Sequence, residues 1–503
     1  MSKTAPDIQL PFIVYSRKDK KPVYQQVFES FKTAILNGSL KAGDRLPASR
    51  QLASGLGVSR NVLILAFEQL QIEGYIVSQT GKGSFVADNI RQRILPGVSP
   101  DEARSGSDKA SMRRGRYNAR FLEILSQPVT KANTILEEIV PFQISVPDPA
   151  LFPFNAWITL AARVHRHMGT YHLGYHDSAG YGPLREVIAN YIRVNRGVRC
   201  GPEHIIITNG SRQALWLLAQ LLLQKGDQYW MENPGYHGAD IAMKHTGASP
   251  CYIPATREYG MDIDFAISKF PHAKLAYLTP SHQYPLGGSM PLAKRQQLIR
   301  WAAKEHAWLI EDDYDSELQY TGRPIPSLQG MDDFDNVIYI GTFSKVLFPA
   351  LRLAYVVMPT KEDAELFAIC KGVCDRQHSL IDQMILTDFI KDGHYARMLK
   401  KMRLHNGQKL RYFLDLIRQY LAPYIDYLPP QAGMHLTCYL VKPEIAVAFF
   451  EKVKQAGLIV TSLRDFSHPP FDQEGFTLGY IAFSEKELKK GVLKLRDIFQ
   501  ACY

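Results

Sequence analysis

The sequence is poor in cysteine, and its cysteines lack the spacings of metal knuckles. Among its six cysteines no pair is separated by two residues, and Cys370 and Cys374 are four positions apart. That spacing places two thiols on one face of a helix and does not surround a zinc ion. We therefore predict reduced structural thiols in a reducing compartment. No disulfide staple is needed, because 503 residues can bury a large core.

Long hydrophobic runs are also missing. The longest apolar stretch, Leu215–Leu223, is interrupted by Gln220 and is too short to span a bilayer. Residues 1–7 lack the apolar segment of a secretory signal. Together these absences exclude a membrane partner and predict a soluble, cytoplasmic chain. Four histidines, His165, His167, His172 and His176, cluster without metal-ligand spacing, so we predict no metal site.

Acidic residues are outnumbered by basic ones. The chain carries 59 Lys and Arg against 49 Asp and Glu, which gives a formal net charge of +10. A basic balance suits nucleic acid, an anionic membrane or anionic ligands, and by itself it does not choose among them. At roughly 100–200 residues per domain, the length allows about two to four domains.

Composition divides the chain into three regions. Residues 12–88 alternate short helical patterns with turn signals, and residues 89–134 read as a basic flexible linker that contains Arg-, Gly- and Ser-rich stretches. In residues 135–503, short β-rich runs alternate with longer helical stretches, which predicts a largely parallel sheet covered on both faces. The runs are Ile205–Thr208, Leu275–Leu278, Trp308–Ile310, Val337–Ile340 and Leu353–Val357.

The first region has the order helix, helix-turn-helix, wing. A helical apolar stripe fills residues 24–37, Ser49 is placed to cap a helix that ends at Leu56, and Ser59 is placed to cap a second helix that ends at Glu73. Residues 76–86 read as a two-stranded wing. We expect an α+β winged helix-turn-helix domain. A small helical interaction module is the alternative.

In such a domain the second helix of the turn motif enters the DNA major groove with its N-terminus first. Arg can read guanine and Asn can read adenine through paired hydrogen bonds, and a basic wing tip can reach the minor groove. The residues that we expect to contact DNA are Arg50, Ser59, Arg60, Asn61, Gly81 and Lys82.

This region resembles the winged-helix domain of the GntR superfamily. The similar strings are Gly38-Ser-Leu-Lys-Ala-Gly-Asp-Arg-Leu-Pro-Ala-Ser-Arg50, Val58-Ser-Arg-Asn-Val62 and Gly81-Lys-Gly-Ser-Phe-Val86. The resemblance implies that the chain binds a double-stranded DNA operator as a homodimer, at two half-sites.

The third region carries a candidate reactive lysine. Lys345 follows a strand-like run in the string Gly341-Thr-Phe-Ser-Lys345, and its flanks are apolar. A lysine in such surroundings can have a lowered pKa and can form a Schiff base with an aldehyde. This pattern favours a functional lysine over a solvated one.

Pyridoxal phosphate (PLP) chemistry needs such a lysine, an acid for the pyridine nitrogen, an anion cradle and a ring stacker. Asp312 and Tyr314 follow the run that begins at Trp308, although acidic runs are often merely solvated or bind cations. Asn209-Gly-Ser-Arg212 joins a strand to a helix, which is typical of a phosphate cradle. Tyr236 is the candidate ring stacker, and a plain core aromatic is the alternative.

Residues 170–500 resemble the fold type I aminotransferases, an α/β fold, and the whole chain resembles the MocR subfamily of GntR regulators. The strings include Tyr175-His-Asp-Ser-Ala-Gly-Tyr-Gly-Pro-Leu-Arg185, Thr279-Pro-Ser-His-Gln-Tyr-Pro-Leu-Gly287 and Glu311-Asp-Asp-Tyr-Asp315. The resemblance implies a PLP aldimine on Lys345 and a pyridine contact from Asp312, with Asp313 as the weaker choice. It further implies a phenolate contact from Tyr314. The implied phosphate ligands are Gly210, Ser211, Thr342 and Arg352.

Two places depart from the aminotransferase pattern. His282 and Gln283 match only loosely the position of an asparagine near the ring. Thr477 stands where aminotransferases carry the arginine that grips the substrate carboxylate, and Arg464 does not fit that motif. A bidentate arginine is the main handle on an amino acid, so we expect no efficient transamination.

Three hypotheses follow from these observations. The first is a PLP-dependent transcription regulator that senses PLP or the adduct of a small amine or amino acid. The second is an active aminotransferase with an accessory DNA-binding domain. The third is a DNA-binding dimer with a pocket that no longer holds a cofactor. The set formed by Lys345, Asp312 and Tyr314 favours the first.

Overall fold

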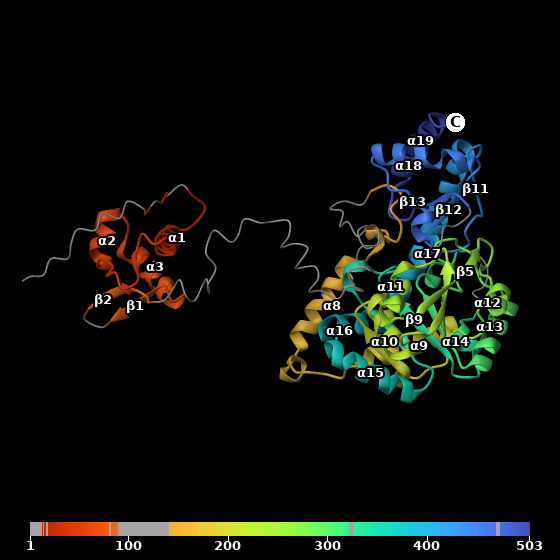
Figure 1. Cartoon of the computed structure of the whole chain (residues 1–503), viewed down its shortest axis with the longest axis horizontal. Coiled ribbons are helices and arrows are strands. Elements are labelled where there is room, and N and C mark those ends of the chain that lie inside the picture. The colour runs from red at the N-terminus through yellow and green to blue at the C-terminus, as the bar shows by residue number, and fades with distance from the viewer. Residues whose placement is uncertain are drawn as a thin grey trace, which may run out of the picture. The chain divides into compact units, whose positions relative to one another are not determined.

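The computed structural model describes residue 13 and residues 15–16, 19–79, 82–88, 140–320, 326–468 and 473–503. The chain divides into two compact units, one within residues 1–117 and the other within residues 118–503 (Figure 1). The predicted linker, residues 89–134, lies outside the described residues and stays a prediction.

The first unit has the predicted order of elements. Its helices are α1 (Val23–Leu36), α2 (Ser49–Leu56) and α3 (Arg60–Ile72), and its antiparallel hairpin is formed by β1 (Ile76–Gln79) and β2 (Gly83–Val86). The predicted cap at Ser49 is wrong, because Ala48 holds the N-cap position and Ser49 begins the helix. Ser59 does hold the N-cap position of α3, although its side chain makes no capping hydrogen bond.

A small apolar core fixes the turn motif on the wing. Phe31 of α1 packs edge-on against Phe67 of α3, with ring centroids 5.5 Å apart, and both belong to the cluster that contains the buried Leu63. The segment before α2 joins the hairpin, because Leu46 N–H donates to the carbonyl of Ser84 at 2.8 Å. The segment that leads into α2 is therefore tied to the wing by backbone hydrogen bonds.

The second unit is built on a sheet with the strand order β3-β10-β9-β8-β7-β4-β5-β6. The strands are β3 (Ile205–Thr208), β4 (Gln228–Asn233), β5 (Ser249–Thr256), β6 (Gly260–Met261), β7 (Leu275–Leu278), β8 (Trp308–Asp313), β9 (Val337–Thr342) and β10 (Ala354–Val357). Strands β5, β4, β7, β8 and β9 are parallel to one another, whereas β10 runs antiparallel to both of its neighbours. The predicted largely parallel sheet is thus confirmed, with the run at Leu353–Val357 as an antiparallel strand.

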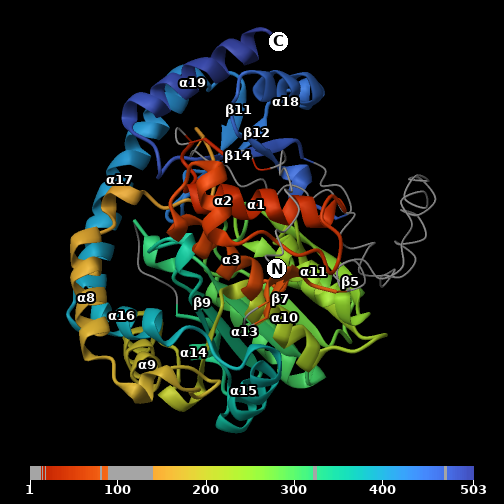
Figure 2. The ribbon, with the colours of Figure 1, turned by 90° about the vertical axis from the view of Figure 1, so that its left-hand side faces the viewer.

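Helices cover both faces of this sheet, as Figures 1 and 2 show. Buried side chains from the two faces form separate clusters, one around Leu218 and Met243 and another around Leu298 and Trp301. The helices are α8 (Phe154–His167), α9 (Gly182–Arg196), α10 (Ser211–Leu222), α11 (His237–Thr246), α12 (Ile263–Lys269), α13 (Leu292–Glu305), α14 (Leu328–Met331), α15 (Lys361–Asp375) and α16 (Leu380–Lys391).

The C-terminal part of this unit is a smaller layer of helices on an antiparallel sheet. The sheet has the order β11-β12-β14-β13, formed by β11 (Ile425–Tyr427), β12 (His435–Leu440), β13 (Thr461–Ser462) and β14 (Gly475–Gly479). Its helices are α17 (His394–Tyr420), α18 (Ala446–Gln455) and α19 (Glu485–Gln500). Among the described residues, no helix has the length and apolar character that crossing a membrane requires.

Candidate functional site

The predicted pocket residues gather at one edge of the large sheet. Gly210 follows β3, Tyr236 follows β4, Tyr314 follows β8, and Lys345 follows β9, each just past the carboxyl end of its strand. These four strands point the same way, so their carboxyl ends share one edge. Open α/β sheets bind ligands at this edge.

Lys345 is half-buried and its ammonium makes no hydrogen bond with the described residues. Burial lowers the pKa of Lys345 to about 8, while the neighbouring carboxylates of Asp315 and Asp312 oppose that shift. The guanidinium of Arg212 lowers the pKa further. A lysine with such a pKa holds a useful fraction of neutral amine near physiological pH, and the neutral amine is the nucleophilic form.

Asp312, the penultimate residue of β8, has one carboxylate oxygen without a partner. Its Oδ2 accepts a hydrogen bond of 2.8 Å from the hydroxyl of Tyr277, whereas its buried Oδ1 accepts none. Burial raises the pKa of Asp312 to about 7. A buried acceptor without a donor is costly, so this oxygen is suited to a ligand N–H.

The adjacent Asp313 has a different environment. Its Oδ2 accepts from the Nε of Arg196 at 2.7 Å, from the hydroxyl of Tyr339 at 2.6 Å and from the hydroxyl of Ser316 at 2.8 Å. Successive residues of a strand face opposite sides of a sheet, which explains the contrast with Asp312. Asp313 is therefore held by the protein through its Oδ2, although its Oδ1 is also buried without a hydrogen-bond partner.

Tyr314 lies in a hydrogen-bonded row with His282 and Asp315. His282 Nδ1 is 2.9 Å from Asp315 Oδ2 and 2.9 Å from the Tyr314 hydroxyl oxygen. A carboxylate only accepts, so the ring hydrogen sits on Nδ1, and the tyrosine oxygen also accepts from it. Burial raises the pKa of Tyr314, so the phenol stays protonated. Its hydrogen remains available to a ligand oxygen.

An anion cradle lies at the start of α10. Gly210 has φ 80°, a backbone conformation that favours glycine, and a Cβ added there would lie 2.9 Å from Arg352 Nη2. The same Arg352 nitrogen donates to the carbonyl of Asn209 at 3.1 Å. Ser211 begins the helix, whose N-terminal N–H groups and dipole attract an anion. Thr342 ends β9, and its hydroxyl accepts from Ser344 N–H at 3.2 Å.

Tyr236 belongs to an aromatic cluster whose centre the sequence did not reveal. Its ring lies 6.1 Å from that of Tyr284 and nearly perpendicular to it, and its hydroxyl accepts from Arg212 Nε at 3.1 Å. Tyr284 also packs edge-on against Tyr314 at 5.7 Å and Phe466 at 5.4 Å. An aromatic residue directly after His282-Gln283 was the only signal for Tyr284 in the sequence.

Gln283 is not directed at a ring position. Its amide nitrogen donates to the carbonyls of Pro234 and Tyr284, and its oxygen accepts from Leu286 N–H. These three hydrogen bonds go to backbone, and the loose match of this residue with an aminotransferase asparagine stays a prediction. Its neighbour His282 does reach the site, through Tyr314.

Thr477 lies in the middle of β14 and is fully buried, with an exposed fraction of 0%. Its neighbours across the sheet are Thr437 and Thr461, so three threonines form one row. Arg464 is exposed and pairs with Glu474. Within the described residues, no arginine takes the place that Thr477 holds in the sheet.

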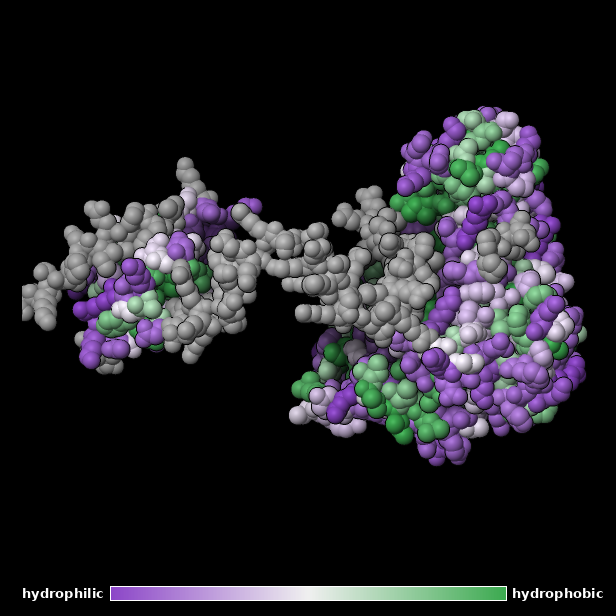
Figure 3. Space-filling view, viewed as in Figure 1, coloured by the Kyte–Doolittle hydropathy of each residue, from purple (hydrophilic) through white to green (hydrophobic). Residues whose placement is uncertain are grey.

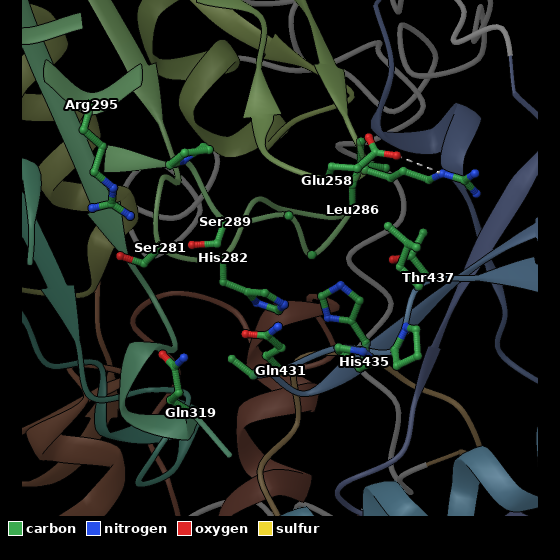
Figure 4. A pocket seen from close by; sticks show the side chains of 18 of the residues that line it. Glu258, Ser281, His282, Leu286, Ser289, Arg295, Gln319, Gln431, His435 and Thr437 are labelled. Atoms are coloured by element: carbon green, nitrogen blue, oxygen red, sulfur yellow. Dashed lines mark ion pairs between the residues drawn. The ribbon is translucent and has the colours of Figure 1, made fainter. Parts of the chain in front are cut away.

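A cavity of about 560 Å³ adjoins this site (Figure 4). It is lined mainly by residues 281–291 and 428–437, and by Arg257 and Glu258. Figure 4 shows the rings of His282 and His435 facing each other in its wall. Lys345, Asp312 and Tyr236 are not among its lining residues, so the cavity is a neighbour of the predicted pocket and shares His282 with it.

In the first unit, the predicted DNA contacts form an exposed polar surface. Arg50, Ser59, Arg60, Asn61 and Lys82 are all exposed. No hydrogen bond or ion pair with the rest of the described chain occupies the side chains of Arg50, Arg60, Asn61 and Lys82. Gly81 lies outside the described residues. A cluster of free donors at the N-terminus of α3 suits groove contacts.

Comparison with protein families assigns both units. Residues 23–86 match the bacterial regulatory proteins of the gntR family, and residues 139–491 match aminotransferase class I and II. Among solved structures, the chain is similar to LysN, the α-aminoadipate aminotransferase of Thermus thermophilus, complexed with N-(5'-phosphopyridoxyl)-L-leucine. That match has a TM-score of 0.70 and 27% identity, and it covers 78% of this chain and 98% of LysN.

Relatives of full length join the same two parts. The probable rhizopine catabolism regulatory protein MocR of Rhizobium meliloti is 35% identical over 97% of this chain and 96% of its own length. The HTH-type pyridoxine biosynthesis transcriptional regulator PdxR of Corynebacterium glutamicum is 28% identical over 94% of this chain and 95% of its own length. The chain therefore belongs to the MocR-type transcription regulators, which join a gntR-family DNA-binding domain to an aminotransferase class I and II domain.

Proposed function

We propose that this regulator binds an operator through its winged-helix unit and binds PLP in the pocket around Lys345, where PLP or its adduct with an amine sets DNA affinity. The observation that carries the proposal is that two features occur together: Lys345 is half-buried and has a lowered pKa, and Asp312 has a buried Oδ1 that accepts no hydrogen bond. The anion cradle at Gly210 and Arg352 lies at the same edge of the sheet.

The residues fit PLP group by group. When bound, PLP supplies an aldehyde for primary amines and an electron-withdrawing pyridine ring. Lys345 would present its neutral amine to the aldehyde, Asp312 Oδ1 would accept from the pyridine nitrogen, and Tyr314 would donate to the phenolate oxygen. Tyr236 would stack on the ring. Gly210, Ser211, Thr342 and Arg352 would hold the phosphate.

Sensing requires that the ligand bind two states of the protein unequally. A ligand amine bound next to Lys345 would change the charge that faces Asp312 and Asp315, the carboxylates that interact with this lysine. The row formed by Tyr314, His282 and Asp315 would respond to the same change, because Asp315 belongs both to this row and to the charges around Lys345. We propose that this local change is what shifts DNA affinity.

A homodimer accounts for an apolar surface on the second unit. Along α15, Leu366, Ile369 and Val373 are 56%, 64% and 86% exposed. Figure 3 shows hydrophobic residues gathered on the surface over this helix. Large exposed apolar patches mark interaction surfaces. A homodimer also carries two winged helices, the number that two half-sites on one operator require.

The alternative is an active aminotransferase. It is favoured by one relative, the 2-aminoadipate transaminase of Thermus thermophilus, which is 30% identical over 71% of this chain and 89% of its own length. The neutral, buried Thr477 argues against it, because this position offers no charge to a substrate carboxylate. We propose that turnover, if measured with amino acid and keto acid pairs, is negligible.

The test is an absorbance titration of the PLP-free full-length chain with PLP, beside Lys345→Ala. We expect a saturable shift of the PLP spectrum in the wild type that is absent from Lys345→Ala. Operator binding is then measured with and without PLP in both proteins. No spectral shift in the wild type would leave the third hypothesis, a DNA-binding dimer without a cofactor. A shift without any change of operator affinity would refute sensing and leave only cofactor binding.

A further inference from the structure

Two histidines and an aspartate meet outside the predicted PLP pocket. His237 and Asp240 lie one turn apart in α11, and His468 follows the short helix η8 (Leu463–Phe466). One ligand atom from each side chain lies within 4.8 Å of the others. His237 and Asp240 are buried and His468 is half-buried. Three metal-binding side chains from distant segments thus share one small volume.

The orientation of His237 is that of a metal ligand. Its Nε2 is 2.6 Å from the backbone carbonyl of Asp465, which only accepts. The hydrogen therefore sits on Nε2, and Nδ1 presents its lone pair to His468. A ligand histidine is usually held this way, with its far nitrogen bonded to a carbonyl or carboxylate.

Asp240 is oriented from both sides. Its Oδ1 accepts from the hydroxyl of Tyr229 at 2.6 Å, and its Oδ2 accepts from the hydroxyl of Tyr252 at 3.1 Å. Lys244 Nζ lies 2.7 Å from the same Oδ2. A cation therefore already occupies the mouth of the cluster. The Lys244 side chain is 22% exposed, so it can turn to solvent and leave its place to an ion.

The nitrogen atoms of the two imidazoles face each other closely. His468 Nε2 is 2.9 Å from His237 Nδ1. Ligand atoms around a tetrahedral zinc ion, at about 2.0–2.1 Å from it, are about 3.3 Å apart. An ion needs the two nitrogens to separate by a few tenths of an ångström and the Asp240 carboxylate to approach. These are side-chain adjustments that leave the backbone in place.

We propose that His237, Asp240 and His468 form a binding site for a divalent ion of the zinc type, with a fourth position open to water. Two imidazoles and one carboxylate are a ligand set that zinc favours. Sequence patterns do not indicate this site, because the spacing between Asp240 and His468 is far outside that of metal motifs. It goes beyond the proposed function and does not depend on PLP.

A bound ion would link two segments of the chain, because the three ligands come from both of them. It fastens residues 463–468 to the turn between β4 and α11, where Gly235 N–H already donates to the carbonyl of Phe466 at 2.9 Å. His468 N–H also donates to Asn233 Oδ1 at 2.8 Å. Tyr236, the proposed ring stacker, directly precedes His237. Zinc binding should therefore stabilise the wall of the PLP pocket.

The experiment is a calorimetric titration of the chelator-treated full-length chain with ZnCl₂, in the presence of a reducing phosphine, with thermal unfolding as a second readout. We expect one zinc ion per chain and a higher unfolding temperature. His468→Ala should weaken binding by at least about tenfold, since even outer-shell changes cost about 10–100-fold in metal affinity. His272→Ala is the matched control, because His272 is an exposed histidine that pairs with Glu305.

Lys244→Met separates a metal site from a purely hydrogen-bonded cluster. Removing the competing ammonium should tighten zinc binding, since Asp240 keeps both tyrosine contacts. Equal zinc affinity in the wild type and in His468→Ala would overturn the site, because the zinc would then be held elsewhere. Unchanged or weaker binding in Lys244→Met would overturn the role of Asp240 and with it the three-ligand set.

Discussion

Substitutions of the neighbouring residues Asp312 and Asp313 should have different effects: one should weaken cofactor binding, and the other should lower the stability of the chain. Asp312→Asn removes the carboxylate that we assign to the ligand, whereas Asp313→Asn removes the charge that pairs with Arg196. The two residues are adjacent in β8, and each substitution changes the same number of atoms. Each variant therefore serves as the control of the other.

For Asp312→Asn we expect weak PLP binding in a stable chain. A hydrogen bond to a charged group contributes about 1.5–3 kcal/mol, which corresponds to roughly a tenfold to hundredfold loss of PLP affinity. The stability without PLP should change little. The pKa of Asp312, raised by burial to about 7, shows that its charge is only weakly stabilised in the folded protein, and an asparagine oxygen still accepts from Tyr277.

For Asp313→Asn we expect the reverse pattern. The side chains of Arg196 and Asp313 are only 8% and 1% exposed, and removing one partner of a buried ion pair costs about 3–5 kcal/mol. Urea unfolding of the PLP-free chain measures this loss, and an absorbance titration measures PLP affinity. If Asp313→Asn abolished PLP binding while Asp312→Asn bound as the wild type does, the assignment of the two carboxylates would be refuted.

Three further predictions concern the reactivity of Lys345, the DNA-binding surface and the apolar face of α15. The rate of PLP capture should rise with pH around a midpoint near 8, because burial lowers the pKa of Lys345 to about 8 and only the neutral amine reacts; a midpoint near the usual lysine value would contradict the described pocket. Arg60→Ala should weaken operator binding in a gel-shift assay by about 1–3 kcal/mol, the value of one bidentate base contact. Operator affinity should fall steeply with salt, because phosphate contacts release counterions. Lys21→Ala, which removes a surface cation paired with Glu29, should leave operator affinity unchanged. Val373→Asp should shift the chain toward monomer in sedimentation, because Val373 is 86% exposed in the apolar face of α15; an unchanged mass would remove this face from the dimer.

The sequence predicted those parts of the fold that depend on local pattern. The apolar runs at Ile205–Thr208 and Leu275–Leu278 coincide with β3 and β7, and the glycines that follow α1 and α3 have positive φ angles as helix ends require. These features depend on neighbours in the chain, so periodicity and turn residues suffice to find them. The cap at Ser49 failed, because the helix begins one residue earlier than the capping pattern implies.

The features that the sequence did not predict depend on contacts between residues that are distant in the chain. Nothing near Tyr284 in the sequence indicates that its ring packs between Tyr314 and Phe466. The contrast between Asp312 and Asp313 arises from Arg196, which lies 117 residues before Asp313 and reaches only one of the two carboxylates. Strand alternation predicts that two adjacent carboxylates face opposite sides of the sheet. Which of the two sides binds the ligand depends on the residues that pack against each side in the folded protein.

The pairing of β3 with β10 has a consequence for how the chain reaches its native state. Thr208 and Ala354 are register partners, and Gly210 and Arg352, the two sides of the anion cradle, lie just beyond them. Contacts between segments so distant in sequence form late and slowly. The cradle is thus absent from any partly folded species in which this pairing is missing. Because a ligand stabilises only the species that binds it, an anion held in this cradle would stabilise the finished sheet and none of its partly folded precursors.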